Sequence, residues 1–435
     1  MKLLKTDFLK DAGILFSGSL VAQIIGFASV FVLGRLYEPS QVGELEIVLK
    51  ISAVLIAIAG LRYEMAIIVE GDQEKANNLT RLSLFLNFIF SCLTLLVLLV
   101  FKDSIASFFG FSSSDFLLFV PLMVWFSGSA EALLLHRNRD KLYSKISTNR
   151  VATSLSGVSY KVGHPFLSLL QANGLLVGHI LGQAVAFGHM LYKLPFHVLR
   201  YSTEQIKQVA KSYKSFPLYS MPGAVLNIVA TSLPVFLISY YAGESATGHF
   251  SYAYKLSYLP LSMLAMALGQ VYFEKLSRSS NNKTETQELS KDLLLFLSGL
   301  GIIPCIILFF WGQELALFFL GDKWSDAGLY IENTILFYTA MFITNPFFCT
   351  FDVYKRLKSE FLFNLLFMVL TGATMVMAYQ LFDSTIIALQ WFSVIGIVLR
   401  LSILQYFFKL VGDFVLTKWL LFAGTVGAIL YVITF

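Results

Sequence analysis

Three lysines and two glutamates lie inside long apolar runs, where a charged side chain is a candidate for binding a charged ligand. Glu44, Glu46 and Lys50 all fall in the first half of the run ELEIVLKISAVLIAIAG, and Lys161 and Lys255 lie deep in two later runs. Glu46 and Lys50 are four residues apart with the acid first, the favourable order for an ion pair on one helix. A lysine with such a partner is neutralised, whereas a lysine without one is suited to bind an anion. The role of these charges depends on the elements that carry them.

The composition places these elements in a membrane. Of the 435 residues, 57% are hydrophobic and only 14% are charged, against about 25% charged in a typical soluble domain. The mean hydropathy is +0.71. Many runs approach the roughly 20 residues that a helix needs to cross the hydrocarbon core. The sequence therefore predicts an all-α polytopic membrane protein.

The apolar runs predict twelve transmembrane helices, and a further run, TKWLLFAGTVGAILYVITF, is long enough to be a thirteenth. The basic start of the chain continues into a full span with no cleavage pattern, which indicates a retained first helix. The predicted spans are 13–36, 42–69, 82–101, 115–135, 148–170, 174–194, 216–241, 247–274, 292–312, 327–353, 359–382 and 385–408.

The charges of the loops predict the orientation. The N-terminal tail and the even-numbered loops hold 22 lysines and arginines, whereas the odd-numbered loops hold only Arg35, Lys102 and Lys323. Positive residues accumulate on the cytoplasmic side of membrane proteins. We therefore expect a cytoplasmic N-terminus, and span two should enter the membrane from outside.

The two halves of the chain resemble each other. A shift of 205 residues places FVLGRLYEPSQVGELEIVLKIS over FLISYYAGESATGHFSYAYKLS without a gap, and Lys50 then falls on Lys255. An even number of spans separates the two segments, so both halves should face the same way, as in transporters with parallel repeats. The predicted organisation is an N-terminal lobe at 1–194, a basic cytoplasmic linker helix at 195–215, a C-terminal lobe at 216–413 and the extra run at 414–435.

Lys50 and Lys255 are expected at the same depth in the membrane, but only Lys50 has an acidic partner on its own helix. Lys50 is about eight residues into its span, which at 1.5 Å per residue places it about 12 Å deep, and the repeat gives Lys255 the same depth. A lysine that faces lipid there costs about 2.5–3.5 kcal/mol, so both should face the protein interior or water. Ser251 stands where Lys50 has Glu46. Lys255 therefore favours an anionic ligand or an acid on another span.

Two other cations are candidates for the same role. Lys161 precedes Gly163–His164–Pro165, a kink of the kind found where a cavity opens, although a kink also serves packing alone. Arg62 lies near the cytoplasmic end of span two. It is suited either to receive an anionic headgroup or to anchor the interface in a pair with Glu64.

Several polar or small residues are expected to serve helix packing. Gly174, Gly178 and Gly182 recur every fourth residue and predict a close-packing face, and Asn87 and Asn345 predict interhelical hydrogen bonds. The three cysteines all lie in apolar runs and are expected to be free thiols.

Enzymatic motifs are absent from the sequence. There is no GxxxxGK[ST] loop, no HExxH, no GxSxG and no cluster of Cys and His at metal-ligand spacing. The outer loops are short, which leaves little room for a catalytic domain. We therefore predict a protein that is not an enzyme and that needs neither cofactor nor metal.

The chain resembles the bacterial Wzx-type flippases of polysaccharide units, which belong to the multidrug/oligosaccharidyl-lipid/polysaccharide exporter superfamily. The similarity lies in FSGSLVAQIIGFASVFVLGRLYEPSQVGELE and LRYEMAIIVEGDQEKANNLTRL, and it continues with GHILGQ in span six and GDKWSDAGLYIENTILFYTAMFITNPF before and through span ten. It covers nearly the whole chain.

This resemblance implies two six-helix lobes around a central cavity, in the bacterial inner membrane. It also implies a substrate of undecaprenyl-pyrophosphate carrying a short oligosaccharide, which moves from the cytoplasmic to the periplasmic leaflet. A polysaccharide polymerase and a chain-length regulator are the protein partners that such a role implies, and no nucleic acid is involved. The extra C-terminal run departs from the twelve-span plan of the family.

A mechanism follows as a hypothesis. Lys50, Lys255 and Lys161 would line the cavity and attract the pyrophosphate, while Arg62 would receive the headgroup first. An ion gradient is a candidate driving force, with Glu44, Glu46 or Asp352 as the carrier. Two other functions stay open: export of drugs or organic cations, which a lysine-lined cavity disfavours, and polymerisation of glycans within the membrane.

Overall fold

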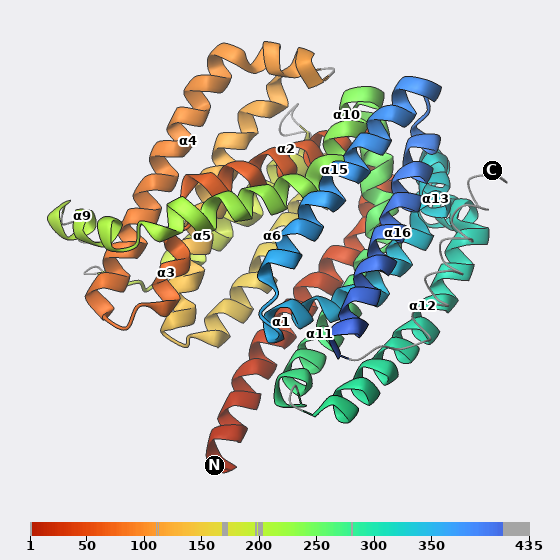
Figure 1. Ribbon diagram of the computed structural model, residues 1–435. Helices are drawn as coiled ribbons and strands as arrows, with labels where there is room; N and C mark the ends of the chain where they lie inside the picture. Colours follow the sequence, from red (N-terminus) through yellow and green to blue (C-terminus); the bar gives the residue numbers. More distant parts are fainter. Residues whose placement is uncertain are drawn as a thin grey trace. The chain divides into compact units, whose positions relative to one another are not determined.

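The computed structural model describes residues 2–109, 111, 113–167, 173–195, 198, 203–279 and 282–411, and for residues 2–16 and Leu357 it describes the backbone alone. Every regular element among these residues is helical (Figure 1). The all-α class predicted from composition is confirmed. The run expected to form a thirteenth span lies outside the described residues.

The helices divide into two compact units, and the first comprises Met1–Ser232 and Gly243–Ser245. It contains the predicted spans one to six, the linker and the first part of α10. Its elements are α1 (Lys2–Leu36), α2 (Pro39–Ala59), α3 (Tyr63–Val69), α4 (Gln73–Phe109), η1 (Asp115–Phe119), α5 (Val120–Arg139), α6 (Tyr143–Leu167), α7 (Gly174–Leu191), α9 (Thr203–Ser212), η2 (Phe216–Ser220) and the start of α10 (Met221–Ser257).

The second unit comprises Leu233–Ala242 and Ala246–Phe435. Its core is rich in aromatic side chains, among them the buried Phe337, Phe347, Phe351 and Phe407. Its further elements are α11 (Leu259–Ser279), α12 (Lys283–Leu320), η3 (Asp322–Trp324), α13 (Ser325–Thr344), η4 (Asn345–Phe348), α14 (Cys349–Val353), α15 (Leu357–Phe382) and α16 (Thr385–Val411). The lobe boundaries at 194 and 215 stay a prediction.

Nine helical segments of the described residues are long and apolar enough to cross a membrane. Together with the fold, they identify a multi-pass membrane protein. Three parts of the predicted spans fall short of this test: span two in α2, span five in α6, and the part of span eight that lies in α11. Lys50 and Lys161 lie in α2 and α6, whereas Lys255 lies at the end of α10, within the segment Phe216–Ser257 that meets the test. The total of twelve spans stays a prediction.

Span two is not one continuous helix. The helix α2 begins at Pro39, after Glu38, and ends at Ala59 with Gly60 as its cap. Leu61 and Arg62 then take positive φ angles of 49° and 62°, which interrupt the helix before α3 begins at Tyr63. The uninterrupted span predicted over 42–69 is wrong on this point, because the backbone breaks at 60–62.

The internal repeat reappears in the backbone. Within α10 the helix is broken at Gly243, which has φ 80° and ψ −174°. The shift of 205 residues places Gly243 over Glu38, the residue that precedes α2. A positive φ is costly for most residues but not for glycine. The chain therefore turns at equivalent positions in the two halves, as the repeat predicts.

The glycines at every fourth position of α7 pack closely on α6. A Cβ atom on Gly182 would lie 3.0 Å from the carbonyl oxygen of Thr153, and one on Gly178 would lie 3.0 Å from that of Gly157. A side chain at either position would push the two helix backbones apart. The predicted close-packing face is confirmed, and α6 is its partner.

Candidate functional site

Lys50 and Glu46 form the ion pair that their spacing predicts. The Lys50 Nζ lies 3.4 Å from Glu46 Oε1, and the two side chains are 32% and 13% exposed. The exposed fraction of Lys50 leaves part of its ammonium group accessible. The pair therefore partly neutralises Lys50 but does not enclose it.

Lys255 lies in the last turn of the α10 helix, in the second unit. Its Nζ lies 5.4 Å from the centre of the Tyr252 ring, within the range of a cation–π contact. The position one turn before it is Ser251, which is buried. Lys255 thus has an aromatic ring beside it where Lys50 has a carboxylate on its own helix.

Lys161 lies on α6 where that helix meets α1 and α7. The hydroxyl of Tyr37 donates to the backbone carbonyl of Lys161 at 2.6 Å. Its side chain packs on Gly178, because a Cβ atom there would lie 2.5 Å from Lys161 Cγ. Pro165 lies near the end of α6, which continues to Leu167. The glycine of α7 therefore makes the space that the lysine stem occupies.

Arg62 stands at the break between α2 and α3. Its Nη1 lies 4.0 Å from Glu64 Oε1, at the limit of an ion pair. The side chain of Arg62 is 26% exposed and that of Glu64 is 10% exposed. The predicted pair with Glu64 is present, and the Arg62 side chain remains partly exposed although its Nε is buried.

The three carboxylates predicted as ion carriers have different surroundings. Glu44 accepts a hydrogen bond from Asn173 Nδ2 at 2.8 Å, and Glu46 is paired with Lys50 as above. Asp352 is exposed on α14 and lines a cavity of about 380 Å³ in the second unit, together with Tyr258 and Asn345.

A buried arginine that the sequence analysis did not single out lies near this cavity. Arg400 of α16 is 9% exposed, and its Nη1 donates to Asn345 Oδ1 at 2.7 Å. Its Cζ lies 5.1, 5.9 and 5.2 Å from the ring centres of Phe348, Phe363 and Phe367. Asn345 in turn donates to the hydroxyl of Tyr258. A scan for every cation inside an apolar run would have found Arg400, which lies in GIVLRLSIL.

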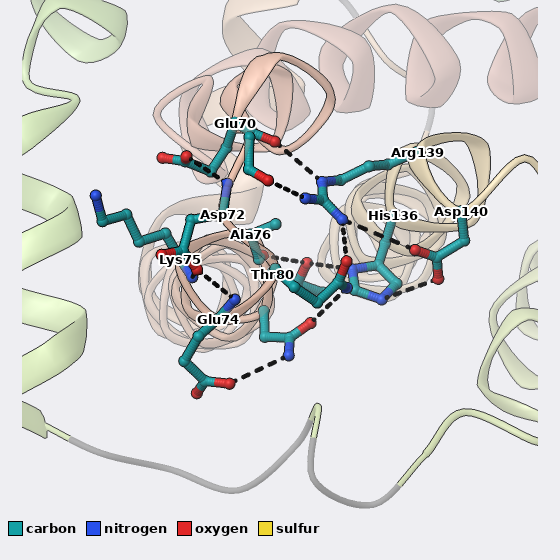
Figure 2. A network of polar contacts seen from close by, with 12 residues as sticks. Glu70, Asp72, Glu74, Lys75, Ala76, Thr80, His136, Arg139 and Asp140 are labelled. Atoms are coloured by element: carbon teal, nitrogen blue, oxygen red, sulfur yellow. Dashed lines mark hydrogen bonds and ion pairs between the residues drawn. The ribbon is translucent and has the colours of Figure 1, made fainter.

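A polar network joins the α3–α4 turn to the end of α5 (Figure 2). Arg139 donates to the backbone carbonyls of Glu70 and Gly71 at 3.1 and 3.2 Å. The buried His136 contacts Thr80 Oγ1 at 3.0 Å, and its other ring nitrogen lies 3.5 Å from Asp140. Arginine at a helix end satisfies carbonyls that the helix leaves free. This network holds the ends of three helices of the first unit together.

The linker helix α9 packs on the same region through its apolar face. Ile206 and Val209 are buried against Tyr63, Ala66 and Leu79 of α3 and α4. The contact of α9 with α4 is visible in Figure 1.

Two tyrosines hold the linker to the α3–α4 region by hydrogen bonds. The hydroxyl of Tyr63 donates to the carbonyl of Ala210 at 3.0 Å, and that of Tyr213 donates to Glu70. The N–H of Asp72 and the Tyr213 hydroxyl together hold the pKa of the Glu70 carboxyl below its usual value. The bond to Glu70 raises the pKa of Tyr213 to about 12.

Metal binding receives no support from the described part of the chain, where no group of three or more His, Cys, Asp and Glu side chains is placed to hold an ion. The cysteines Cys92, Cys305 and Cys349 are free thiols.

The fold is that of a membrane transporter. Lipid II flippase MurJ in an inward closed conformation aligns with a TM-score of 0.73 and 13% identity, over 97% of this chain and 91% of that chain. A multidrug resistance MATE family transporter of the MOP superfamily, facing inward, aligns with a TM-score of 0.69 and 13% identity, over 92% and 98%. The MATE transporter VcmN of Vibrio cholerae aligns with 0.59 and 12%, over 94% and 97%. These proteins are transporters and flippases rather than enzymes.

The sequence itself places the chain in a family. The family model described as polysaccharide biosynthesis protein matches residues 32–328, which is more than half of the chain. The chain belongs to this family of polysaccharide biosynthesis proteins. A search of the curated proteins finds no match.

Proposed function

We propose that the protein moves undecaprenyl-pyrophosphate-linked oligosaccharide units from the cytoplasmic to the periplasmic leaflet of the bacterial inner membrane. The glycan would be a repeat unit of an O-antigen or another surface polysaccharide. The family and the flippase-like fold support a lipid-linked substrate. The positive loops support a cytoplasmic N-terminus.

The observation that carries the proposal is the position of the charges. Lys50 and Lys161 lie in α2 and α6, two helices that are too polar to count as ordinary membrane spans, and Lys255 lies at the end of an apolar segment that does count. Charged residues in transmembrane segments usually face a bundle interior or a water-filled cavity and mark substrate pathways. All three charges are positive, which suits a pyrophosphate.

During transport the pyrophosphate would contact these positive side chains one after another. Arg62, partly accessible at the α2–α3 break, receives the pyrophosphate. Lys50, Lys161 and Lys255 then attract it along its path, while the lipid tail stays in the bilayer. Alternating exposure of the bound headgroup to the two sides completes the transfer. Glu44, Glu46 and Asp352 remain the proposed carriers for coupling to an ion gradient.

Export of drugs is the second candidate function, because solved structures with this fold include multidrug transporters. Cationic drugs are repelled by lysines, so the charge pattern disfavours them. A resistance assay with the wild-type chain in a drug-sensitive strain decides: protection against several organic cations supports drug export, and unchanged sensitivity supports the flippase.

The test of the flippase proposal is complementation of a bacterial strain that lacks its own flippase for a known polysaccharide. The other enzymes of the polysaccharide pathway in that strain should accept a broad range of glycans. We expect the wild-type chain to restore surface glycan, and Lys255→Ala at equal membrane level to reduce it. A parallel complementation experiment uses a strain that lacks the polysaccharide polymerase, because such a strain displays single repeat units on its surface. Polymer restored only in that strain would identify the protein as a polymerase and overturn the proposal.

A further inference from the structure

The cavity of the second unit that Asp352 lines combines polar and apolar side chains. Its volume is about 380 Å³, and its lining comes from α11, η4, α14 and Tyr258. Small-molecule sites typically have volumes of about 300–1,000 Å³. A Cβ atom on Gly269 of α11 would lie 3.3 Å from the Cα atom of Pro346 in η4, so this glycine lets two of the lining elements approach closely. The cavity is therefore a candidate ligand site built within one unit.

A chain of hydrogen bonds determines which group Tyr258 offers to a ligand. An arginine side chain can only donate, so Asn345 turns its Oδ1 toward Arg400 Nη1, at 2.7 Å. The amide nitrogen of Asn345 then donates to the hydroxyl oxygen of Tyr258. Among the described residues, no group accepts the proton of this hydroxyl. Tyr258, which is 4% exposed and lines the cavity, therefore has a hydroxyl proton to donate.

Asp352 of α14 and Gln270 of α11 add acceptors and a second donor. Both side chains are exposed and line the cavity. Within the described part of the chain, neither side chain forms a hydrogen bond or an ion pair. An ionised carboxylate only accepts hydrogen bonds, whereas an amide both donates and accepts. Together with the hydroxyl of Tyr258, the cavity thus offers a donor, an acceptor and an amide to a ligand.

This combination fits an uncharged sugar ring better than an anion or an organic cation. Every sugar hydroxyl can both donate and accept, and the C–H faces of the ring can pack on Ala265, Met266 and Phe273 of the same cavity. A pyrophosphate is disfavoured, because Asp352 carries the only charge among the described lining residues and that charge is negative. An organic cation would contact Asp352 but would leave the hydroxyl proton of Tyr258 without an acceptor.

We propose that this cavity binds an uncharged sugar residue. Asp352 accepts hydrogen bonds from the sugar hydroxyls, the hydroxyl of Tyr258 donates to one of them, and Gln270 does both. The assignment of this sugar to the glycan of a lipid-linked substrate rests on the proposed function, whereas the binding of a sugar does not. The carboxylate that the sequence suggests as an ion carrier would thus also contact the glycan.

The experiment measures binding of soluble ligands to the purified full-length chain, in a detergent without a sugar headgroup, so that its outcome is independent of flipping. Saturation-transfer NMR is suited to weak ligands with a Kd of about 1 mM. The probes are the methyl glycosides of neutral hexoses, 6-deoxyhexoses and N-acetylhexosamines, with tetraethylammonium as an organic cation and inorganic pyrophosphate as a competitor. The variants are Asp352→Asn, Tyr258→Phe and Gln270→Leu. Matched controls are Asp292→Asn and Gln380→Leu, at exposed positions of α12 and α15.

A sugar site predicts that at least one glycoside binds to the wild type and to both controls. Asp352→Asn should weaken this binding about tenfold or more, because it removes a hydrogen bond to a charged group, and Tyr258→Phe should weaken it several-fold. Binding of no glycoside overturns the proposal, and so does displacement of the glycoside by pyrophosphate. Binding of tetraethylammonium that Asp352→Asn abolishes and Tyr258→Phe leaves unchanged would identify a cation site and overturn the proposal as well.

Gln270→Leu keeps the test decisive if the other two variants do not fold. Gln270 is exposed and has no partner among the described residues, so its substitution should change the unfolding temperature no more than Gln380→Leu does. It should still weaken glycoside binding several-fold, and an unchanged affinity overturns the proposal. Glycoside binding by a chain that moves no lipid-linked glycan would retain this inference and overturn the proposed function, so the two can fail separately.

Discussion

The pair of Lys50 and Glu46 allows a structural role to be separated from a role in substrate binding. Lys50→Met keeps most of the side-chain volume and removes the positive charge. Glu46→Gln keeps the shape and removes the negative charge. Both changes delete the same ion pair, whose atoms lie 3.4 Å apart. Only the first deletes a cation that an anionic ligand can contact.

The ion pair itself contributes little to stability. A helical pair four residues apart is worth about 0.3–0.5 kcal/mol when solvent reaches it, and the Lys50 side chain is 32% exposed. Either substitution should therefore lower the free energy of unfolding by less than about 1 kcal/mol, which corresponds to a few degrees at most. Both variants should reach the membrane at the wild-type level.

The contact with a pyrophosphate is worth much more. A unit charge at about 4 Å from another contributes about 4 kcal/mol at an effective dielectric constant near 20. Since about 1.4 kcal/mol is tenfold in affinity, Lys50→Met should weaken headgroup binding by up to about a thousandfold. Glu46→Gln leaves Lys50 charged and removes its competing carboxylate, so binding should stay the same or improve.

The assay compares the two variants for surface polysaccharide in the complemented strain, at equal membrane levels, with thermal unfolding of the purified proteins as the control. We expect a large loss of polysaccharide for Lys50→Met, no loss for Glu46→Gln, and similar stability for both. Equal loss of polysaccharide in the two variants would refute the reasoning, because the pair would then matter only as a structural unit.

Three further predictions concern packing and the linker. Gly182→Leu should destabilise the first unit by about 1–3 kcal/mol or more, since the new side chain meets the Thr153 carbonyl and overpacks the contact between α6 and α7. A low yield of folded protein would show this loss of stability, and a wild-type yield would contradict it. Arg400→Met should leave the unfolding temperature unchanged or raise it, because it removes a buried charge. Arg400→Lys should lower the unfolding temperature, because lysine cannot reproduce the planar contacts with three rings and an amide. Equal effects of the two substitutions would count against a role for these ring contacts. Tyr213→Phe should increase hydrogen exchange of α9, because it removes the hydrogen bond to Glu70. In the wild type the linker should loosen only as the pH falls through the lowered pKa of the Glu70 carboxyl, below the ordinary range of a glutamate. Exchange that is unaffected by the substitution would contradict the attachment.

Much of the fold follows from hydropathy, because the length of an apolar run is a strong signal in a membrane. The break at Gly60–Arg62 could not be predicted, since the run continues through it and neither Leu61 nor Arg62 is a residue type that favours a positive φ angle. The shift of 205 residues carries the start of α2 onto Gly243, where the helix α10 is broken, so the repeat locates this break.

The candidate site was only partly predictable. The spacing of Glu46 and Lys50 was sufficient for their ion pair, because neighbours on one helix face are determined by the helix itself. The partners of Arg400 lie on other helices, so no spacing along the chain reveals them. Likewise, periodicity shows that α9 has an apolar face but not that α3 and α4 cover it.

The most direct test of the account is reconstitution. The purified chain is placed in vesicles that carry an undecaprenyl-pyrophosphate-linked oligosaccharide, and an enzyme outside the vesicles reports the arrival of the glycan in the outer leaflet. We predict that the wild-type protein exposes the glycan faster than protein-free vesicles, and that Lys255→Ala returns the rate to that background. Equal rates for the wild type and protein-free vesicles would contradict the claim that this protein moves the lipid-linked glycan.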